Sequence, residues 1–153
     1  MKTINQYIQE KFELNKNTKV IYKYFPKTRE ELREILEERL KEDKNANLND
    51  IDVSLITDMI GLFKNLDPHN IDISEWDVSN VTSMYNMFKE CENFNSNLSK
   101  WNVHNVEDMY SMFEGCYKFN SDLSNWKVSK VKDMRYMFDE CNSLKNKPSW
   151  YKQ

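Results

Sequence analysis

The chain has 153 residues, of which 31% are charged, and its formal net charge is −3 at pH 7. This length suits one domain with a continuous core, and the absence of a basic excess argues against a nucleic-acid partner. No segment has the roughly 18 consecutive apolar residues that a membrane span needs, and the N-terminus has no signal-peptide pattern. We therefore expect a cytoplasmic protein that contacts no membrane.

Residues 1–47 are predicted to form an N-terminal α/β capping segment. "TINQYIQEKFEL" predicts a short helix, "TKVIYKYF" a strand, and "KTREELREILEERLKED" a longer helix that starts with a capping box of Thr28 and Glu31. The apolar stripe of this longer helix consists of Leu32, Ile35, Leu36 and Leu40. We expect the segment to cover one open end of the structure that follows.

From residue 48 the sequence repeats every 25 residues. "SEWDVSNVTSMYNMFKEC" returns as "SKWNVHNVEDMYSMFEGC" and again as "SNWKVSKVKDMRYMFDEC", and a weaker copy with Ile51 in place of Trp precedes them. The tryptophans lie at Trp76, Trp101, Trp126 and Trp150, so their spacings are 25, 25 and 24. A period of this length predicts a solenoid. The predicted solenoid has about four repeats over residues 48–150 and is followed by a tail at 151–153.

Two periodicities lie within each copy. Leu98, Trp101 and Val103 suggest a short extended segment, whereas apolar residues spaced by three or four from Val106 to Cys116 suggest a short helix. One strand and one short helix per repeat are therefore predicted. The repeated Trp, Met, Phe and Cys residues are interpreted as core packing, with one indole N–H per Trp to satisfy.

The pattern L-S-x-W-x-V-x-x-V-x-x-M-x-x-M-F-x-x-C-x-x-F-N-S resembles the BspA-like leucine-rich repeats, in the 25-residue branch common in bacterial surface proteins. The resemblance covers about residues 48 to 150. It implies a right-handed leucine-rich-repeat-like solenoid with a strand-lined face, so the predicted fold class is α/β. In that family the repeats usually have adhesive or protein-binding roles.

The groups that could carry chemistry have structural interpretations. The three cysteines lack CxxC pairs and a fourth ligand for zinc, so we expect them to be buried hydrophobes and predict no metal site. His69 and His104 have no catalytic partner in the sequence. Asp108 and Asp133 are interpreted as caps at helix N-termini. No catalytic residue and no cofactor are predicted.

The outward positions that change from copy to copy are the candidate protein-binding residues. On the predicted strand face they are Glu75, Asp77, Lys100, Asn102, Asn125 and Lys127, which run from acidic to basic along the repeats. On the predicted helix face they are Tyr85, Tyr110, Arg135 and Tyr136, residue types enriched in binding hot spots.

The favoured function is a non-enzymatic module that binds a protein partner through one extended face. Three alternatives stay open. The first is a small inhibitor, of the kind that phages or mobile elements encode, which blocks a host defence enzyme. The second is a truncated surface adhesin. The third is an enzyme with a site where the cap meets the solenoid, which would need an acid and histidine cluster near Asp67, His69 and Asp72.

Overall fold

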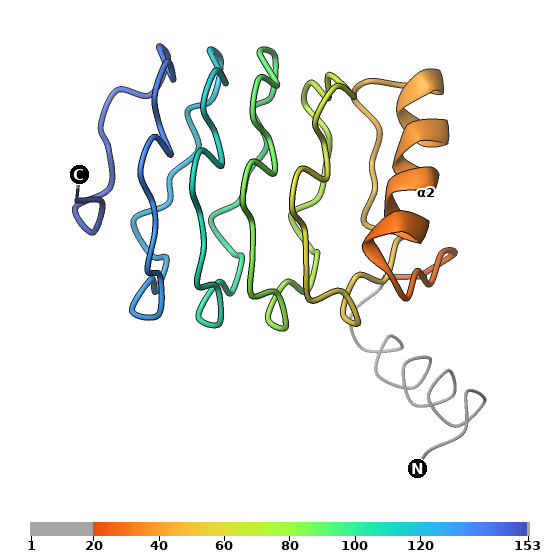
Figure 1. Cartoon of the computed structure of the whole chain (residues 1–153). Coiled ribbons are helices and arrows are strands. Elements are labelled where there is room, and N and C mark those ends of the chain that lie inside the picture. The colour runs from red at the N-terminus through yellow and green to blue at the C-terminus, as the bar shows by residue number, and fades with distance from the viewer. Residues whose placement is uncertain (1–19, 153) are drawn as a thin grey trace.

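The computed structural model describes residues 20–152, and the chain forms a stack of four similar loops with one helix packed at the first of them (Figure 1). We call each loop a rung: rung 1 is 48–72, rung 2 is 73–97, rung 3 is 98–122 and rung 4 is 123–147. Residues 25 apart lie side by side in neighbouring rungs, as the parallel bridges Asp58 to Ser83, Ser83 to Asp108 and Asp108 to Asp133 show. The 25-residue period of the sequence is thus the length of one rung.

The helix α2 spans Arg29–Glu42, and it is the only α-helix among residues 20–152. Its N-cap is Thr28, whose hydroxyl accepts a hydrogen bond from the backbone N–H of Glu31 at 3.2 Å, as predicted. The Glu31 carboxylate accepts from the N–H of Lys27 at 2.7 Å and not from Thr28, so the capping box is completed one residue earlier. The buried face of α2 is the predicted stripe: Leu32, Leu36 and Leu40 are buried, and Ile35 is partly buried.

The prediction of one strand per repeat is wrong. Neighbouring rungs are joined by isolated parallel bridges, and no strand is present in the described part of the chain. The reason is the density of turns: within rung 3 the N–H groups of Trp101 and Val106 donate to the carbonyls of Leu98 and Val103, three residues earlier. A chain that turns every three to five residues leaves no extended run long enough for a ladder.

The prediction of one short helix per repeat is also wrong. The segment from Met84 to Cys91 consists of successive turns, in which Met87 donates to Met84 and Cys91 to Phe88. Asn86 and Glu90 have φ angles of 55° and 61°, in the left-handed region, so an α-helix cannot pass through them. The same two positions are left-handed in every rung, as the φ angles of Gly61, Asn65, Ser111, Gly115, Tyr136 and Glu140 show. The predicted leucine-rich-repeat-like solenoid, with its strand and helix, is therefore not the observed fold.

The predicted N-terminal α/β cap is only partly observed. Its longer helix is α2, but within the predicted strand the described residues 20–25 form a single bridge, from Tyr24 to Ile51. The predicted short helix at residues 3–14 and the first two residues of the predicted strand lie outside the described residues.

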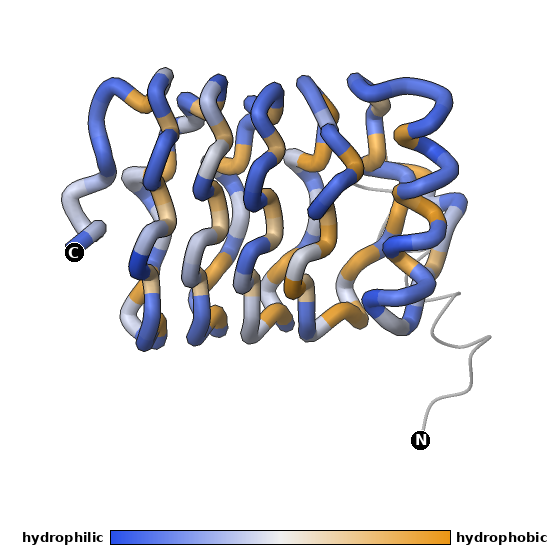
Figure 2. Tube along the Cα trace, turned by 45° about the horizontal axis from the view of Figure 1, so that its top comes forward, coloured by the Kyte–Doolittle hydropathy of each residue, from blue (hydrophilic) through white to orange (hydrophobic). Residues whose placement is uncertain are grey.

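The core is built from columns of identical or similar apolar residues, one per rung. Figure 2 shows hydrophobic segments recurring at matching places along the stack. The indole rings of Trp76 and Trp101 stack with centroids 6.4 Å apart, and Trp101 and Trp126 do so at 6.5 Å. Trp150 continues this column with its ring 6.2 Å from Trp126 and so covers part of the last rung.

The three cysteines are free and buried, as expected for packing residues. Each thiol donates a hydrogen bond to a carbonyl of the preceding rung: Cys116 to Phe88 at 3.0 Å and Cys141 to Phe113 at 3.1 Å. Burial raises the pKa of the Cys91 and Cys141 thiols to about 12 and raises that of Cys116 as well. The thiols are therefore held neutral inside the stack.

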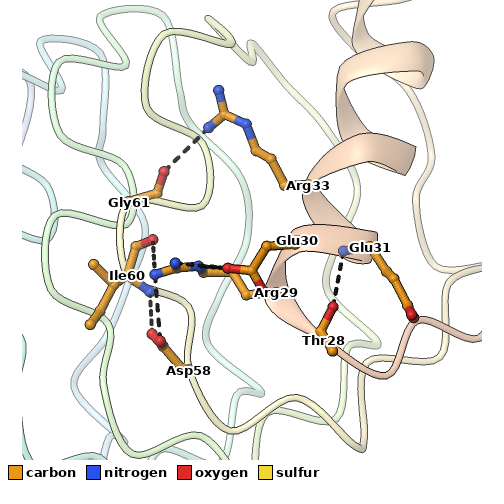
Figure 3. A network of polar contacts seen from close by, with 8 residues as sticks. All are labelled: Thr28, Arg29, Glu30, Glu31, Arg33, Asp58, Ile60 and Gly61. Atoms are coloured by element: carbon orange, nitrogen blue, oxygen red, sulfur yellow. Dashed lines mark hydrogen bonds and ion pairs between the residues drawn. The ribbon is translucent and has the colours of Figure 1, made fainter.

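Helix α2 completes the hydrogen bonding of the first rung. In the interior, the N–H groups of one rung donate to carbonyls of the next, for example Gly61 to Tyr85 at 2.9 Å. No rung precedes rung 1 among residues 20–152, and arginines of α2 donate to its carbonyls instead (Figure 3). Arg33 donates to the carbonyls of Gly61 and Leu62 at 3.3 and 2.9 Å, and Arg29 donates to that of Ile60 at 3.4 Å.

Candidate functional site

The four candidate residues from the predicted helix face lie together. The rings of Tyr85 and Tyr110 stack with centroids 5.2 Å apart and an interplanar angle of 10°. Tyr136 meets Tyr110 edge to face at 5.5 Å, and the Arg135 guanidinium lies over the Tyr110 ring at 5.6 Å. We call these residues the tyrosine ridge. They come from rungs 2, 3 and 4 and reach the same surface because each occupies the left-handed turn or the residue before it.

The ridge is accessible and held in place. Tyr136 is 49% exposed, Arg135 is exposed, and Tyr85 and Tyr110 are half-buried. The rings are thus supported by stacking on one another while part of their surface faces solvent. Aromatic side chains fixed in this way offer contact area at a low cost in conformational entropy.

An ion pair fixes the basic end of the ridge. Arg135 donates through Nε and Nη2 to the two carboxylate oxygens of Asp133, at 3.0 and 2.7 Å. Hydrogen bonds from Arg135 lower the pKa of Asp133, and the same contact raises the pKa of Arg135, so both groups are charged. Asp133 also accepts from the backbone N–H of Arg135, and Asp108 does the same for Tyr110 at 2.9 Å. These aspartates therefore cap turns, not helices as predicted.

Sequence reasoning missed two residues that extend the ridge. Ile60, 40% exposed, precedes Tyr85 in the same column of the repeat. The side chain of Arg29 reaches from α2 to Asp58 and the carbonyl of Ile60, as Figure 3 shows. The 25-residue register could have found Ile60. No sequence signal places Arg29 there, because its position depends on how α2 packs on rung 1.

The six candidates from the predicted strand face lie on a different part of each rung, and all are exposed: Glu75, Asp77, Lys100, Asn102, Asn125 and Lys127. Glu75 and Lys100 form an ion pair of 2.8 Å between rungs. The side chains of Asp77 and Asn102 accept hydrogen bonds within their own turns, from Ser79 and His104. Among the described residues no hydrogen bond, ion pair or ring contact joins this set to the tyrosine ridge.

The residues named for an enzyme site do not form a shared cluster. His69 and Asp67 pair at 3.3 Å on the surface, where their side chains are 36% and 53% exposed. The Asp72 carboxylate is engaged in a turn, where it accepts from the N–H and hydroxyl of Ser74. Among residues 20–152, no three His, Cys, Asp or Glu side chains come together in a way that could hold a metal ion.

Across residues 20–152, no helix has the length and apolar character that crossing a membrane requires.

Comparison with known proteins gives one result. The chain matches no curated protein and no solved structure significantly. Residues 30–151 match the model of a family described as "Mycoplasma protein of unknown function, DUF285". The match starts in α2 and takes in all four rungs, which is more than half of the chain. The chain therefore belongs to the DUF285 family.

Proposed function

We propose that the protein is a non-enzymatic binding module that holds a partner protein through the tyrosine ridge. The observation that carries the proposal is the continuous contact of Tyr85, Tyr110, Arg135 and Tyr136 across three rungs. Tyr and Arg are the residues that most often dominate the binding energy of protein interfaces. A ridge that is rigid before binding loses little conformational entropy on association, which favours affinity.

The structure of the rungs supports this role. Each rung is joined to the next by repeated hydrogen bonds, so neighbouring ridge residues keep a fixed spacing. Exposed Ile60 and the Arg29 side chain lengthen the ridge toward α2. The ridge surface carries aromatic groups and both members of an ion pair. Such a surface is better suited to bind a protein than to bind a uniformly charged polymer.

Two finer proposals accompany this one. We infer kinship with the BspA-like repeat proteins from the repeated W-x-V-x-x-V and M-F-x-x-C patterns, independently of the backbone path. We also propose a cytoplasmic location, which is supported by three cysteines that are all free. Fractionation of the native cell, with the protein detected by antibody, tests the location: recovery with the cell envelope would contradict it.

Site-resolved photo-crosslinking tests the proposed function. A photoreactive phenylalanine replaces Tyr85, Tyr110 or Tyr136 in the native host, and in control variants it replaces exposed Lys64 or Lys118. We expect the same partner to be crosslinked from the three ridge positions and not from the controls. The double variant Tyr85→Ala with Tyr110→Ala, without any photoreactive residue, should no longer retain that partner in pull-downs. Crosslinks of equal strength from ridge and control positions would refute the ridge as the binding face.

A further inference from the structure

The outer face of rung 4 is less well covered than the corresponding face of rung 3. Three apolar columns that are 0–2% exposed in rung 3 become only partly buried in rung 4. The pairs are Val103 and Val128, Val106 and Val131, and Met109 and Met134. Trp150 and Tyr151 pack on Trp126 and Phe138 and so cover another part of the rung. An apolar strip therefore faces outward at this end of the stack.

A row of backbone donors lies on the same face. In rung 3, the N–H groups of Met109, Ser111, Phe113 and Gly115 donate to carbonyls of rung 4 at 2.8 to 3.0 Å. The corresponding N–H groups of rung 4 have no acceptor within residues 20–152; they belong to Met134, Tyr136, Phe138 and Glu140. Unpaired backbone donors of this kind form a template for an added chain segment.

Unlike the edge of a β-strand, this row of free N–H groups has no free carbonyl between one donor and the next. The carbonyls of Met134, Tyr136 and Phe138 accept from N–H groups three residues later in their own turns. The carbonyls of Arg135 and Met137, which lie between them in the sequence, accept hydrogen bonds from the N–H groups of Ser111 and Phe113 in rung 3. From Met109 to Gly115, and at the matching positions of rungs 1 and 2, the hydrogen bonds between rungs run from one rung's N–H to the next rung's carbonyl, so their positive ends point out at rung 4. The direction reverses just before this row, where the Lys132 N–H donates to the Glu107 carbonyl. Aligned N–H groups of this kind attract anionic and carbonyl oxygens.

Side-chain charge adds to the same polarity. Rung 1 carries five acidic residues and one lysine, whereas rung 4 carries six basic residues and three acidic ones. The basic residues of rung 4 are Lys127, Lys130, Lys132, Arg135, Lys145 and Lys147. The end that exposes the donor row is therefore also the basic end of the stack.

A second copy of the chain does not complement this face. Two such faces brought together would oppose donors to donors, which cannot bond. The rung 1 carbonyls that would match the donors are already bonded by Arg29 and Arg33, so head-to-tail stacking would have to displace α2.

We propose that the outer face of rung 4 binds an extended acidic segment of a partner protein, which adds to the stack in the way that a further rung would. Carbonyls of the segment accept from the four free N–H groups, and apolar residues three apart cover Val128, Val131 and Met134. Its acidic side chains meet the basic residues of rung 4. The proposal rests on the donor row, the apolar strip and the charge of rung 4. Of the tyrosine ridge it shares only the Arg135 side chain and the backbone N–H of Tyr136, so the two proposals can fail separately.

The chain itself supplies a probe. A peptide of residues 102–116, with Cys116→Ser, has valine and methionine three apart, three acidic residues, and no lysine or arginine. The ¹⁵N-labelled full chain is titrated with this peptide and the amide shifts are followed by NMR. We expect saturable binding, with the largest shifts at the amides of Met134, Tyr136, Phe138 and Glu140. The equivalent amides of rung 3 are already bonded and serve as the internal control.

Matched charge reversals complete the test. Lys127→Glu with Lys145→Glu, on rung 4, should weaken binding by about tenfold, as expected when charges beside an interface are reversed. The control Lys64→Glu with Lys118→Glu makes the same change in net charge, but on rungs 1 and 3, and should leave the affinity for the peptide unchanged. Tyr85→Ala with Tyr110→Ala, in the tyrosine ridge, should also leave that affinity unchanged. Equal binding of a scrambled peptide or of heparin would overturn the proposal, as would shifts centred away from rung 4 or dimerisation in place of binding.

Discussion

Trp101 donates its indole N–H to the backbone carbonyl of Ile73, 28 residues earlier, at 2.9 Å. The same bond joins Trp76 to Leu48 and Trp126 to Leu98. Each tryptophan thus satisfies a buried carbonyl of the preceding rung while its ring stacks on the tryptophan of the next. One residue per rung provides both the apolar contact and the hydrogen bond that fix the spacing between rungs.

Trp101→Phe should lower the free energy of unfolding by about 2 to 4 kcal/mol, because it leaves the buried Ile73 carbonyl without its donor and removes part of a buried ring. Urea unfolding followed by circular dichroism measures the change. Trp150→Phe removes the same bond, to the Leu123 carbonyl at 2.8 Å, but at a partly buried position, so it should cost less. Equal losses for the two variants would contradict the importance assigned to burial of the interior bonds.

The buried thiols predict a loss of stability at alkaline pH. The pKa of Cys91 and Cys141 in the folded chain is about 12, whereas an unfolded thiol has a pKa of about 8.5. Above that value the unfolded chain releases protons that the folded chain keeps, so unfolding becomes easier as pH rises. The contribution of the buried thiols to the free energy of unfolding is complete below the unfolded pKa. It is lost progressively as the pH rises from the unfolded pKa to the folded pKa. Each thiol should reduce stability by about 1.4 kcal/mol per pH unit in that window.

Urea unfolding at pH 8.0 and 9.5 checks this slope. In Cys91→Ala the fall in stability between the two pH values should be smaller than in the parent chain, although the variant is less stable at both. An unchanged slope would mean that Cys91 ionises in the folded state. Rapid modification of the three thiols under native conditions would contradict their burial directly.

The left-handed turns predict unequal effects for two substitutions. Gly115 has a φ of 74°, and an added Cβ would lie 3.3 Å from the Cα of Glu90, so Gly115→Ala should destabilise the chain by about 1 to 2 kcal/mol. Glu90 has a φ of 61° with a side chain already present, so Glu90→Gly should relieve strain and change stability by less than about 1 kcal/mol. Thermal unfolding of the two variants measures both effects, and a larger loss for Glu90→Gly would contradict this explanation.

Arg33→Ala should weaken the contact between α2 and rung 1 by about 1 to 3 kcal/mol, since the carbonyls of Gly61 and Leu62 lose a charged donor. Hydrogen exchange should then rise in α2 and rung 1 while rungs 3 and 4 keep their protection. Glu34→Ala changes a neighbouring residue for which no bond to rung 1 is found in the described structure, and it serves as the control. Uniform loss of protection along the stack would argue against a local capping role.

The sequence predicted the features that depend on register. The 25-residue period placed Trp101 above Trp76, the cysteines in the core and Tyr85 beside Tyr110, because identical residues in a stack must share an environment. It predicted Thr28 as the start of a helix from local chemistry alone. The backbone path was not predictable in this way: Met84, Met87, Phe88 and Cys91 have the spacing of a helix, but successive turns give the same inward spacing. The left-handed φ of Asn86 and Glu90 separates the two. Gly61, Asn65 and Gly115 occupy the same two positions in other rungs and favour such a φ, but Glu90, Ser111, Tyr136 and Glu140 do not, so the signal is visible only when the copies are compared.

We propose the tyrosine ridge as a protein-binding face, and photo-crosslinking from position 110 in the native host is the sharpest test of that proposal. We expect a single crosslinked partner band at position 110. The same band should recur at positions 85 and 136, be absent at position 118, and disappear when Tyr85→Ala is added. A crosslinked partner that persists in the Tyr85→Ala background and appears equally from position 118 would contradict the claim.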